Sequence, residues 1–437
     1  MPESNERTQR VAVLADSDTR WKWGALTAHR IAPESRLDGL LLRGRATPTA
    51  RQLEEVGVQA DSLRELTSAE FLSEMEQDPE QYDVVVLALV GGGVQAMLHG
   101  LAKVWQGRGR RPVLVTGYVG VVYEKLADGL LLRHGADIVL ANSRQDAERF
   151  RAVYEGVGAS ADSVVEAALP FLGGAPHQDH DPYTVTFAVQ PSVPKTRTDR
   201  LYLLNRMADH ARAHPDREVL IKLRSLPGEH TTHVENLPYQ RLAEDVGLPD
   251  NCRLVYGNMG EVLDRTSLLV TVSSTAALES LHRRIPTAIL TDLGVRERLG
   301  NHHFIGSGCL ASWDQLDQGH IPEPNPDWVA VQGVAADGGY ESCFDAARKR
   351  IAELRQAPEL PPVAPYYNPV TAPGYLPSLL ARHRLAPDGT PLPQAPEPVA
   401  ARGIRHTMRK VTRGAARGAY RYGAQRVAPA LRRLGKL

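Results

Sequence analysis

The fold is decided by residues 267–291, which read SLLVTVSSTAALESLHRRIPTAILT. Residues 268–272 are apolar and end in β-branched side chains, as a buried strand does, whereas residues 275–282 are good helix formers with apolar positions at helical spacing. The change of period falls on residues 273–274, and a second apolar run follows at 287–290. The stretch predicts a strand, a hydroxyl-rich turn, a helix and a further strand, which is the repeating unit of a parallel α/β sheet.

The turn between this strand and this helix has the composition of an anion site. Ser273, Ser274 or Thr275 can cap the helix, and the free N–H groups of its first turn carry partial positive charge. These residues and their amides would hold a nucleotide phosphate, and Glu279 would accept hydrogen bonds from ribose hydroxyls. An ordinary helix cap explains the same local pattern. The rest of the chain has to separate the two interpretations.

Length and composition predict a soluble protein of two domains. The chain has 437 residues, of which 42% are hydrophobic and 23% charged. We expect no signal peptide, because the first residues are polar, and no apolar run reaches the roughly 18–20 residues that span a bilayer. Cys252, Cys309 and Cys343 are widely spaced, which favours buried thiols over a disulfide framework or a zinc site. The expected location is the cytoplasm.

Charge is distributed unevenly along the chain. Acids and bases number 51 each, but residues 401–437 carry many bases and no acid. Arginines that recur every four residues predict a basic amphipathic helix in this tail, weakened by glycines. We expect the tail to bind an anionic membrane surface, so that the protein is peripheral at the inner face of the cell membrane. Nucleic-acid binding and a solvated, disordered tail are the alternatives, and the tail's only aromatics, Tyr420 and Tyr422, are few for nucleic acid.

Alternating strand and helix patterns predict two doubly wound, Rossmann-like α/β domains. The predicted segments are a first domain at 10–172, a linker at 173–183, a second domain at 184–356, a Pro-rich strap at 357–400 and the basic tail at 401–437. The second domain is expected to end in a helix at 345–354, and the strap to hold a short helix near 376–383. Ligands of such sheets lie beyond the carboxyl ends of the strands, where the candidate residues should be sought.

Strands are expected at 11–15, 83–90, 112–116, 136–141 and 164–169 in the first domain, and at 183–189, 218–223, 252–255, 268–272 and 287–290 in the second. Residues at or just beyond the ends of the first-domain strands are the candidates for the acceptor side of a site. They are Trp21, Gly92 and Tyr118.

The serine-rich turn resembles a motif of known glycosyltransferases. Residues 272–279, VSSTAALE, followed by RIP at 284–286, resemble the serine motif of bacterial sialyltransferases, polysialyltransferases and capsule or teichoic-acid polymerases. Those enzymes have the two-domain GT-B architecture, and the resemblance covers roughly residues 10–355. They also carry a His-Pro pair after a lysine-containing strand, and here Lys222 is present but the pair is absent. From residue 15 onward, ADSDTRWKWG, the chain also resembles a group of Gram-positive glycosyltransferases associated with cell-wall polymers of sialic-acid-like nonulosonic sugars.

This resemblance implies an inverting, metal-independent glycosyltransferase that transfers a sugar to a cell-surface glycan or a lipid-linked acceptor. A nonulosonic acid carried by CMP is one donor that it implies. The nucleotide-sugar donor would be bound by the second domain, without a cofactor. The donor-binding candidates are Gln190, Lys222, Arg224, His230, Tyr256, Gly257, Ser273, Ser274, Thr275 and Glu279.

The acceptor hydroxyl must lose a proton, so a carboxylate of the first domain should face the donor. Asp16 and Asp18, at the end of the first strand, are the first candidates, and Glu124 is the third. A structural interpretation gives Asp16 the role of a helix cap and pairs Asp18 with Arg20. No metal site is expected, because the pair at 302–303, two histidines, lacks a third ligand at suitable spacing.

Two other functions stay open. Non-hydrolysing UDP-sugar 2-epimerases share the double-domain fold, but they have a Ser-Gly-Gly turn where this chain has Ser273-Ser274-Thr275. A non-catalytic binding protein that has kept the fold is the third possibility, since a fold alone does not fix a function.

Overall fold

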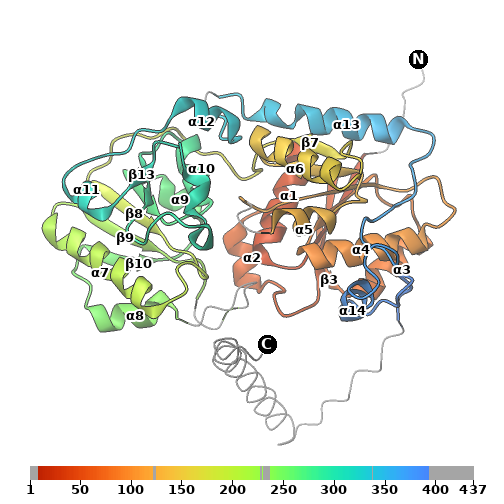
Figure 1. The fold of residues 1–437 in the computed structure, drawn as a ribbon, viewed down its shortest axis with the longest axis horizontal. Helices are drawn as coiled ribbons and strands as arrows, with labels where there is room; N and C mark the ends of the chain where they lie inside the picture. Colours follow the sequence, from red (N-terminus) through yellow and green to blue (C-terminus); the bar gives the residue numbers. More distant parts are fainter. Residues whose placement is uncertain (1–7, 122–124, 227–228, 230–236, 337, 393–437) are drawn as a thin grey trace, which may run out of the picture. The chain divides into compact units, whose positions relative to one another are not determined.

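The computed structural model describes residues 8–121, 125–226, 229, 237–336 and 338–392. Two parallel sheets organise this part of the chain (Figure 1). The first has the order β3-β2-β1-β4-β5-β6-β7, with strands β1 Arg10–Ala15, β2 Arg36–Leu42, β3 Ser62–Leu66, β4 Val84–Ala88, β5 Val113–Gly117, β6 Ile138–Ala141 and β7 Val164–Glu166. The helices of this part are α1 Asp18–Ile31, α2 Ala50–Val56, α3 Ser68–Gln77, α4 Gly91–Val104, α5 Leu126–Leu131 and α6 Arg144–Gly156.

The second sheet repeats the pattern with the order β10-β9-β8-β11-β12-β13. Its strands are β8 Thr184–Ala188, β9 Glu218–Lys222, β10 Cys252–Val255, β11 Leu268–Thr271, β12 Thr287–Leu290 and β13 Leu310–Ala311. Its helices are α7 Arg197–Ala213, α8 Tyr239–Val246, α9 Met259–Leu263, α10 Ala276–His282, α11 Trp313–Asp317 and α12 Pro326–Val331, with the 3-10 turns η1 Glu297–Leu299 and η2 Asn301–Phe304 after β12. The prediction of two parallel doubly wound sheets is confirmed.

Both sheets have their strand order reversed at a central pair of strands. The reversal lies between β1 and β4 in the first sheet and between β8 and β11 in the second. Such switch points leave a crevice beyond the carboxyl ends of the two central strands, where ligands of open α/β sheets bind. The Asp16–Asp18 turn follows β1, and the serine-rich turn follows β11.

The central strands are apolar because both of their faces are covered. Every residue of β4 is buried, as is every residue of β1 after Arg10. Helix α1 lies so close to this sheet that a Cβ at Gly24 would come within 2.6 Å of Val13 and 2.7 Å of Ala88. This close approach requires a glycine, and it packs the middle of α1 tightly against β1 and β4.

The structure contains three strands that the sequence analysis did not predict: β2 and β3 in the first sheet and β13 in the second. The middle of β2 holds Asp38 and Gly39, which interrupt its apolar pattern. Asp38 is nevertheless buried, because Arg10 and Ser62 donate to its carboxylate at 2.6 Å each. β3 is an edge strand and mostly exposed, so it lacks the apolar signal of a central strand.

The helix predicted at 345–354 is present as α13, Asp345–Gln356, preceded by the 3-10 turn η3, Glu341–Phe344. Its predicted place in the second domain is wrong, because α13 packs against β7, β5 and α1 of the first sheet. Ala347 and Ile351 of its buried face join the same core cluster as Val13 and Trp23. The boundaries of the two domains at 172 and 184 stay a prediction.

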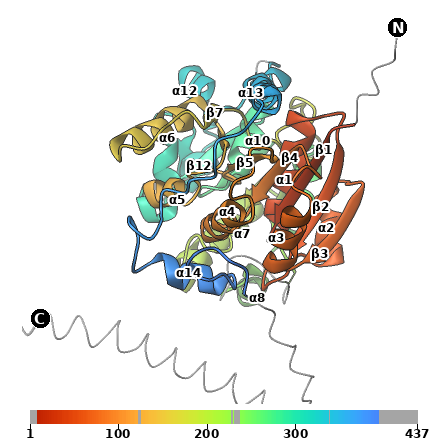
Figure 2. The ribbon, with the colours of Figure 1, turned by 90° about the vertical axis from the view of Figure 1, so that its right-hand side faces the viewer.

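The strap contains the expected short helix, α14 Leu376–Arg382, which packs on α4 of the first sheet (Figure 2). Leu376, Leu379 and Leu380 are its buried residues. The predicted basic helix at 401–437 lies outside the described residues. Within the described ranges, no helix combines the length and the apolarity that a bilayer span requires.

Candidate functional site

A cleft of about 1100 Å³ lies at the carboxyl ends of the strands of both sheets. Its walls come from the segments that follow β1, β4 and β5 on one side and β8, β9 and β11 on the other. Two ion pairs cross from one side to the other: Arg224 pairs with Asp18 at 3.1 Å, and Arg51 pairs with Glu229. The cleft therefore joins the switch points of both sheets, the position at which ligands are expected.

The serine-rich turn lines this cleft, but its polar groups are more fully used than the sequence predicts. Ser273 is 1% exposed, and its hydroxyl donates to the carbonyl of Leu299 at 2.5 Å. Gln190 Oε1 accepts from the amide of Ser273 at 3.0 Å, and the Thr271 hydroxyl accepts from the amide of Ser274 at 3.2 Å. Ser273 therefore helps to build the turn, since its amide and its hydroxyl are both bonded within the protein.

Ser274 and Thr275 form the part of the turn that borders the open cleft. The Ser274 hydroxyl accepts from the amide of Ala276 at 3.2 Å, and Thr275 is the N-cap of α10 without a side-chain cap bond. Thr275 Oγ1 lies 2.7 Å from where a Cβ on Gly120 would stand. Only a glycine at position 120 leaves room for the hydroxyl of Thr275, so the two walls of the cleft approach each other closely at this point.

A buried pair of ionisable groups lies beside this turn. Lys222, the last residue of β9, is 7% exposed, and its Nζ donates to the carbonyl of Leu223 at 2.5 Å. Burial lowers the pKa of Lys222 to about 8, against the attraction of Glu55 and Glu279. Burial also raises the pKa of Glu279, which is 8% exposed on α10. A buried amine at the cleft wall gives an anionic ligand a strong, weakly screened attraction.

The two aspartates after β1 have different surroundings. Asp16 accepts from Arg20 at 2.8 Å and from the amide of Val90 at 3.0 Å, and it does not line the cleft. Asp18 lines the cleft from the first turn of α1 and pairs with Arg224 of the other wall. The cap of α1 is Ser17, which accepts from the Arg20 amide, so the expected cap at Asp16 is wrong. Arg20 pairs with Asp16, and Asp18 pairs with Arg224.

The wall on the side of the first sheet contains a buried arginine that the sequence analysis missed. Arg133 donates to the carbonyls of Gly117 at 2.9 Å and Gly129 at 2.8 Å, and its guanidinium lies 4.0 Å from the ring centroid of Tyr118. Burial lowers its pKa. A lone arginine in the apolar run at 130–133 was the available signal.

Most of the predicted site residues border one cavity. The residues that line it are Asp18, Gly92, Tyr118, Gln190, Lys222, Arg224, Gly257, Ser273, Ser274, Thr275 and Glu279. Trp21 is a core residue at 1% exposure, and Tyr256 bonds to Gln240 at 3.1 Å; neither lines the cleft. Glu124 and His230 lie outside the described residues. The cleft also contains charged residues that were not predicted: Arg20, Lys22, Glu55, Lys125, Asp128, Arg133, Lys195, Glu297 and Arg298.

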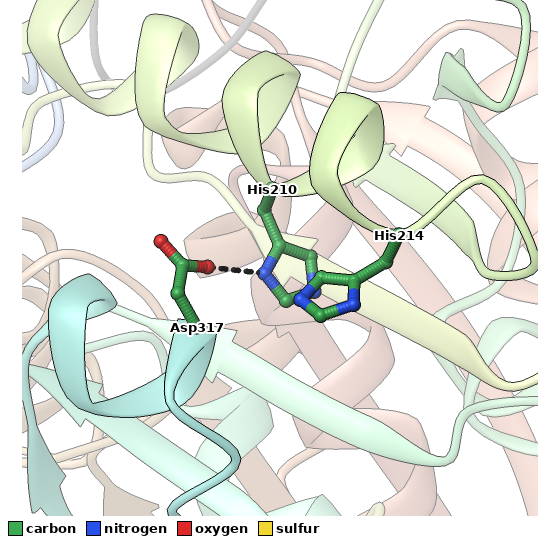
Figure 3. Close-up of side chains that lie close together, drawn as sticks. All are labelled: His210, His214 and Asp317. Carbon is green, nitrogen blue, oxygen red and sulfur yellow. Dashed lines mark hydrogen bonds and ion pairs between the residues drawn. The ribbon is translucent and has the colours of Figure 1, made fainter.

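Among the described residues, one group away from the cleft has the composition of a metal site (Figure 3). It consists of His210 and His214 from the end of α7 and Asp317 from α11, with ligand atoms within 4.8 Å of one another. His210 Nδ1 lies 2.5 Å from Asp317, whose other oxygen accepts from Arg206 at 2.9 Å. The two imidazole rings lie obliquely against each other with centroids 4.6 Å apart. The carboxylate is already shared by a histidine and an arginine, so the group fits a polar network better than a metal centre.

A family model described as "Putative glycosyltransferase (DUF6716)" matches residues 11–354. This match covers both sheets and most of the cleft. The chain belongs to this family. A search of the curated proteins finds no match.

Solved structures agree on the fold. The co-structure of S. aureus MnaA with UDP aligns with a TM-score of 0.51 at 11% identity, covering 81% of this chain and 99% of that one. A UDP-N-acetylglucosamine 2-epimerase from Rickettsia bellii aligns with a TM-score of 0.50 at 10% identity, covering 80% and 99%. A UDP-glucosyltransferase from Polygonum tinctorium has a TM-score of 0.46 at 12% identity, covering 81% and 94%. At these identities the likeness is one of fold, and the architecture of the chain is GT-B-like.

Proposed function

We propose that the cleft binds a nucleotide-sugar on the side of the second sheet and transfers its sugar to an acceptor on the side of the first. The observation that supports this most strongly is the position of the cleft. It joins the switch points of both sheets and carries Lys222, Arg224 and the hydroxyls of the serine-rich turn on one wall. The membership of the glycosyltransferase family supports the type of reaction.

The donor phosphate would lie between Lys222, Arg224 and the Ser274–Thr275 segment. In the transfer, an oxygen of the acceptor forms a bond to the anomeric carbon while the bond from that carbon to the phosphate oxygen breaks. The leaving phosphate takes up the bonding electrons, so cations that already face it stabilise the transition state. Lys222 suits this task because it is held by its bond to Leu223 and shielded from water. Arg224 and Lys222 would take the place of the missing His-Pro pair.

The acceptor proton would pass to Asp18. Of the three predicted bases, Asp18 is the one that is described and lines the cleft. Arg224 holds it at 3.1 Å in the structure. A donor phosphate would compete for the same guanidinium, so donor binding would free the Asp18 carboxylate to accept the proton. Asp16 would act as a positioning residue that fixes the turn through Arg20 and Val90.

The donor that we propose is a CMP-linked nonulosonic acid, transferred with inversion to a cell-surface glycan or a lipid-linked acceptor. The likeness of the serine motif at 272–279 to that of sialyltransferases supports the nucleotide. The strongly basic tail at 401–437 supports an acceptor at an anionic membrane.

Calorimetry with a panel of CMP, CDP, UDP and GDP tests the site and the donor together. We expect CMP or CDP to bind best, and Ser274→Ala to weaken that binding several-fold, since one hydrogen bond to a charged group is lost. Ser342→Ala, at an exposed serine of η3, is the matched control. A preference for UDP together with interconversion of two free UDP-sugars would replace the transferase proposal by an epimerase. Unchanged affinity in Ser274→Ala would remove the turn from the site.

A further inference from the structure

A second, smaller pocket of about 400 Å³ lies next to the cleft, on the side of the first sheet. It is formed by Asp128 of α5 and by the strap residues Tyr367, Thr371, Ala372, Pro373, Gly374 and Tyr375. Asp128 lines both this pocket and the main cleft. The two cavities therefore meet at one carboxylate, and a ligand longer than one sugar can extend from the first into the second.

Two aromatic residues, Tyr367 and Tyr375, line this pocket, and Tyr366 lies beside them. Tyr366, Tyr367 and Tyr375 form a row, with ring centroids 5.5 Å apart for the first two and 5.9 Å for the last two. Tyr375 is 44% exposed although it is a large side chain. The C–H groups of a pyranose ring carry partial positive charge and pack on the negative face of such rings, which suits a sugar.

Polar groups stand at the edge of this row. The Tyr367 hydroxyl donates to Asp128 Oδ1 at 3.0 Å, which orients both side chains. Asp128 is exposed, and within the described residues its Oδ2 makes no further hydrogen bond. A carboxylate oxygen of this kind accepts bonds from vicinal sugar hydroxyls, while the adjacent rings bury the apolar face of the sugar.

The loop that carries the tyrosines is held in one conformation. The Asn368 side chain accepts from the amides of Val370 and Thr371 at 2.8 and 3.1 Å, and the Thr371 hydroxyl donates to the Tyr366 carbonyl at 2.5 Å. The carbonyl of Tyr367 is fixed by Gln95 at 3.1 Å and lies 2.8 Å from His99 Nε2. A surface that is ordered before binding loses little conformational entropy when a ligand arrives.

We infer that the row of tyrosines and Asp128 form a subsite for the acceptor, and that this acceptor is a glycan chain of more than one sugar unit. This inference rests on the proposed transfer in the main cleft. The acceptor end would enter the cleft past Asp128, and the preceding sugar would lie on Tyr367 and Tyr375. The strap thereby sets a minimum length for the acceptor.

A membrane contact is the competing use of this surface, because Val370 at the tip of the loop is 88% exposed. The pocket itself favours a glycan. Its exposed polar groups are the Tyr375 phenol, the Asp128 carboxylate and the Thr371 side chain, which an acyl chain would have to desolvate without a partner.

Binding to an array of neutral and anionic oligosaccharides of increasing length tests this subsite. We compare the full-length protein with Tyr375→Ala, Tyr375→Phe and Tyr202→Ala, the last being a tyrosine of α7 that is 37% exposed. We expect the full-length protein to retain oligosaccharides but not their monomers. Tyr375→Ala should bind roughly tenfold more weakly because the stacking face is lost. Tyr375→Phe keeps the ring and should bind like the unchanged protein, as should Tyr202→Ala.

The inference is overturned if the unchanged protein retains no oligosaccharide, or if Tyr375→Ala binds oligosaccharides as tightly as the unchanged protein. It is also overturned if Tyr375→Ala loses only its binding to vesicles of anionic phospholipid, which would make the loop a membrane contact. Calorimetry with CMP on the same samples separates this result from the donor site. If the unchanged protein binds oligosaccharides but not CMP, the result counts against the proposed donor site and not against the acceptor subsite.

Discussion

The two walls of the cleft use polar groups in opposite ways. On the side of the second sheet, Lys222, Ser273 and Glu279 are almost fully buried and held by neighbouring carbonyls or by the field of nearby charges. On the other side, Asp18 and Asp128 are more accessible, and Asp128 leads to exposed tyrosine rings. Buried charge fixes one geometry and suits a constant nucleotide phosphate, whereas exposed rings and carboxylates tolerate a range of sugars.

The largest expected effect is on kcat and concerns Asp18, the carboxylate on the first-sheet side of the cleft. Asp18→Asn should lower kcat by about 10²–10⁴-fold, since a positioned general base contributes that much. Affinity for the nucleotide should not fall and should rise modestly, because Asp18 competes with the phosphate for Arg224 and Asn removes the competing charge. Steady-state kinetics with calorimetry measure both quantities, and Asp314→Asn on α11, an exposed aspartate, is the control. Unchanged kcat would remove Asp18 as the base and leave the acceptor wall without an assigned one.

On the second-sheet side of the cleft, a substitution should change the affinity for the nucleotide. Lys222→Met should weaken nucleotide binding by roughly 10- to 100-fold, as expected for the loss of a charged hydrogen bond in a shielded site. The Tm at pH 7 should not fall, because burial already penalises the charged amine. Lys349→Met, at an exposed lysine of α13, should change neither quantity. Equal affinity in both variants would show that the phosphate binds elsewhere.

The pH dependence of nucleotide binding should follow the titration of Lys222. Its pKa of about 8 means that Lys222 is charged below pH 8 and loses its charge as the pH rises through that value. Nucleotide affinity should therefore fall by up to about tenfold per pH unit above 8, towards the level of Lys222→Met. Calorimetric titrations between neutral and alkaline pH measure this. A flat profile in this window contradicts the role of the amine.

A smaller shift of that profile should follow a change at Glu279. Glu279 attracts the Lys222 charge and raises its pKa against the effect of burial. Glu279→Gln should therefore move the midpoint of the profile below pH 8. An unchanged midpoint would mean that Glu279 is uncharged in the cleft, which is the direction in which burial drives its pKa, and would contradict its attraction for the Lys222 charge.

The apolar strands were readable from the sequence because each central strand is buried on both faces. β2 was missed because the partners of Asp38 lie 28 and 24 residues away along the chain, and no local pattern shows that this charge is paired. The hydrogen bond of the Ser273 hydroxyl was missed for the same reason, since its acceptor, the carbonyl of Leu299, follows 26 residues later. Arg133 was missed because its partners are backbone carbonyls, which leave no trace in side-chain composition.

The position of a bound nucleotide is the most direct test of the claim that the cleft is the donor site. A co-crystal structure with CMP measures it. We expect the phosphate within hydrogen-bond distance of Ser274 and Lys222, with the Arg224–Asp18 pair opened. A nucleotide bound outside the cleft, or one whose phosphate lies against the first-sheet wall with that pair intact, would contradict the claim.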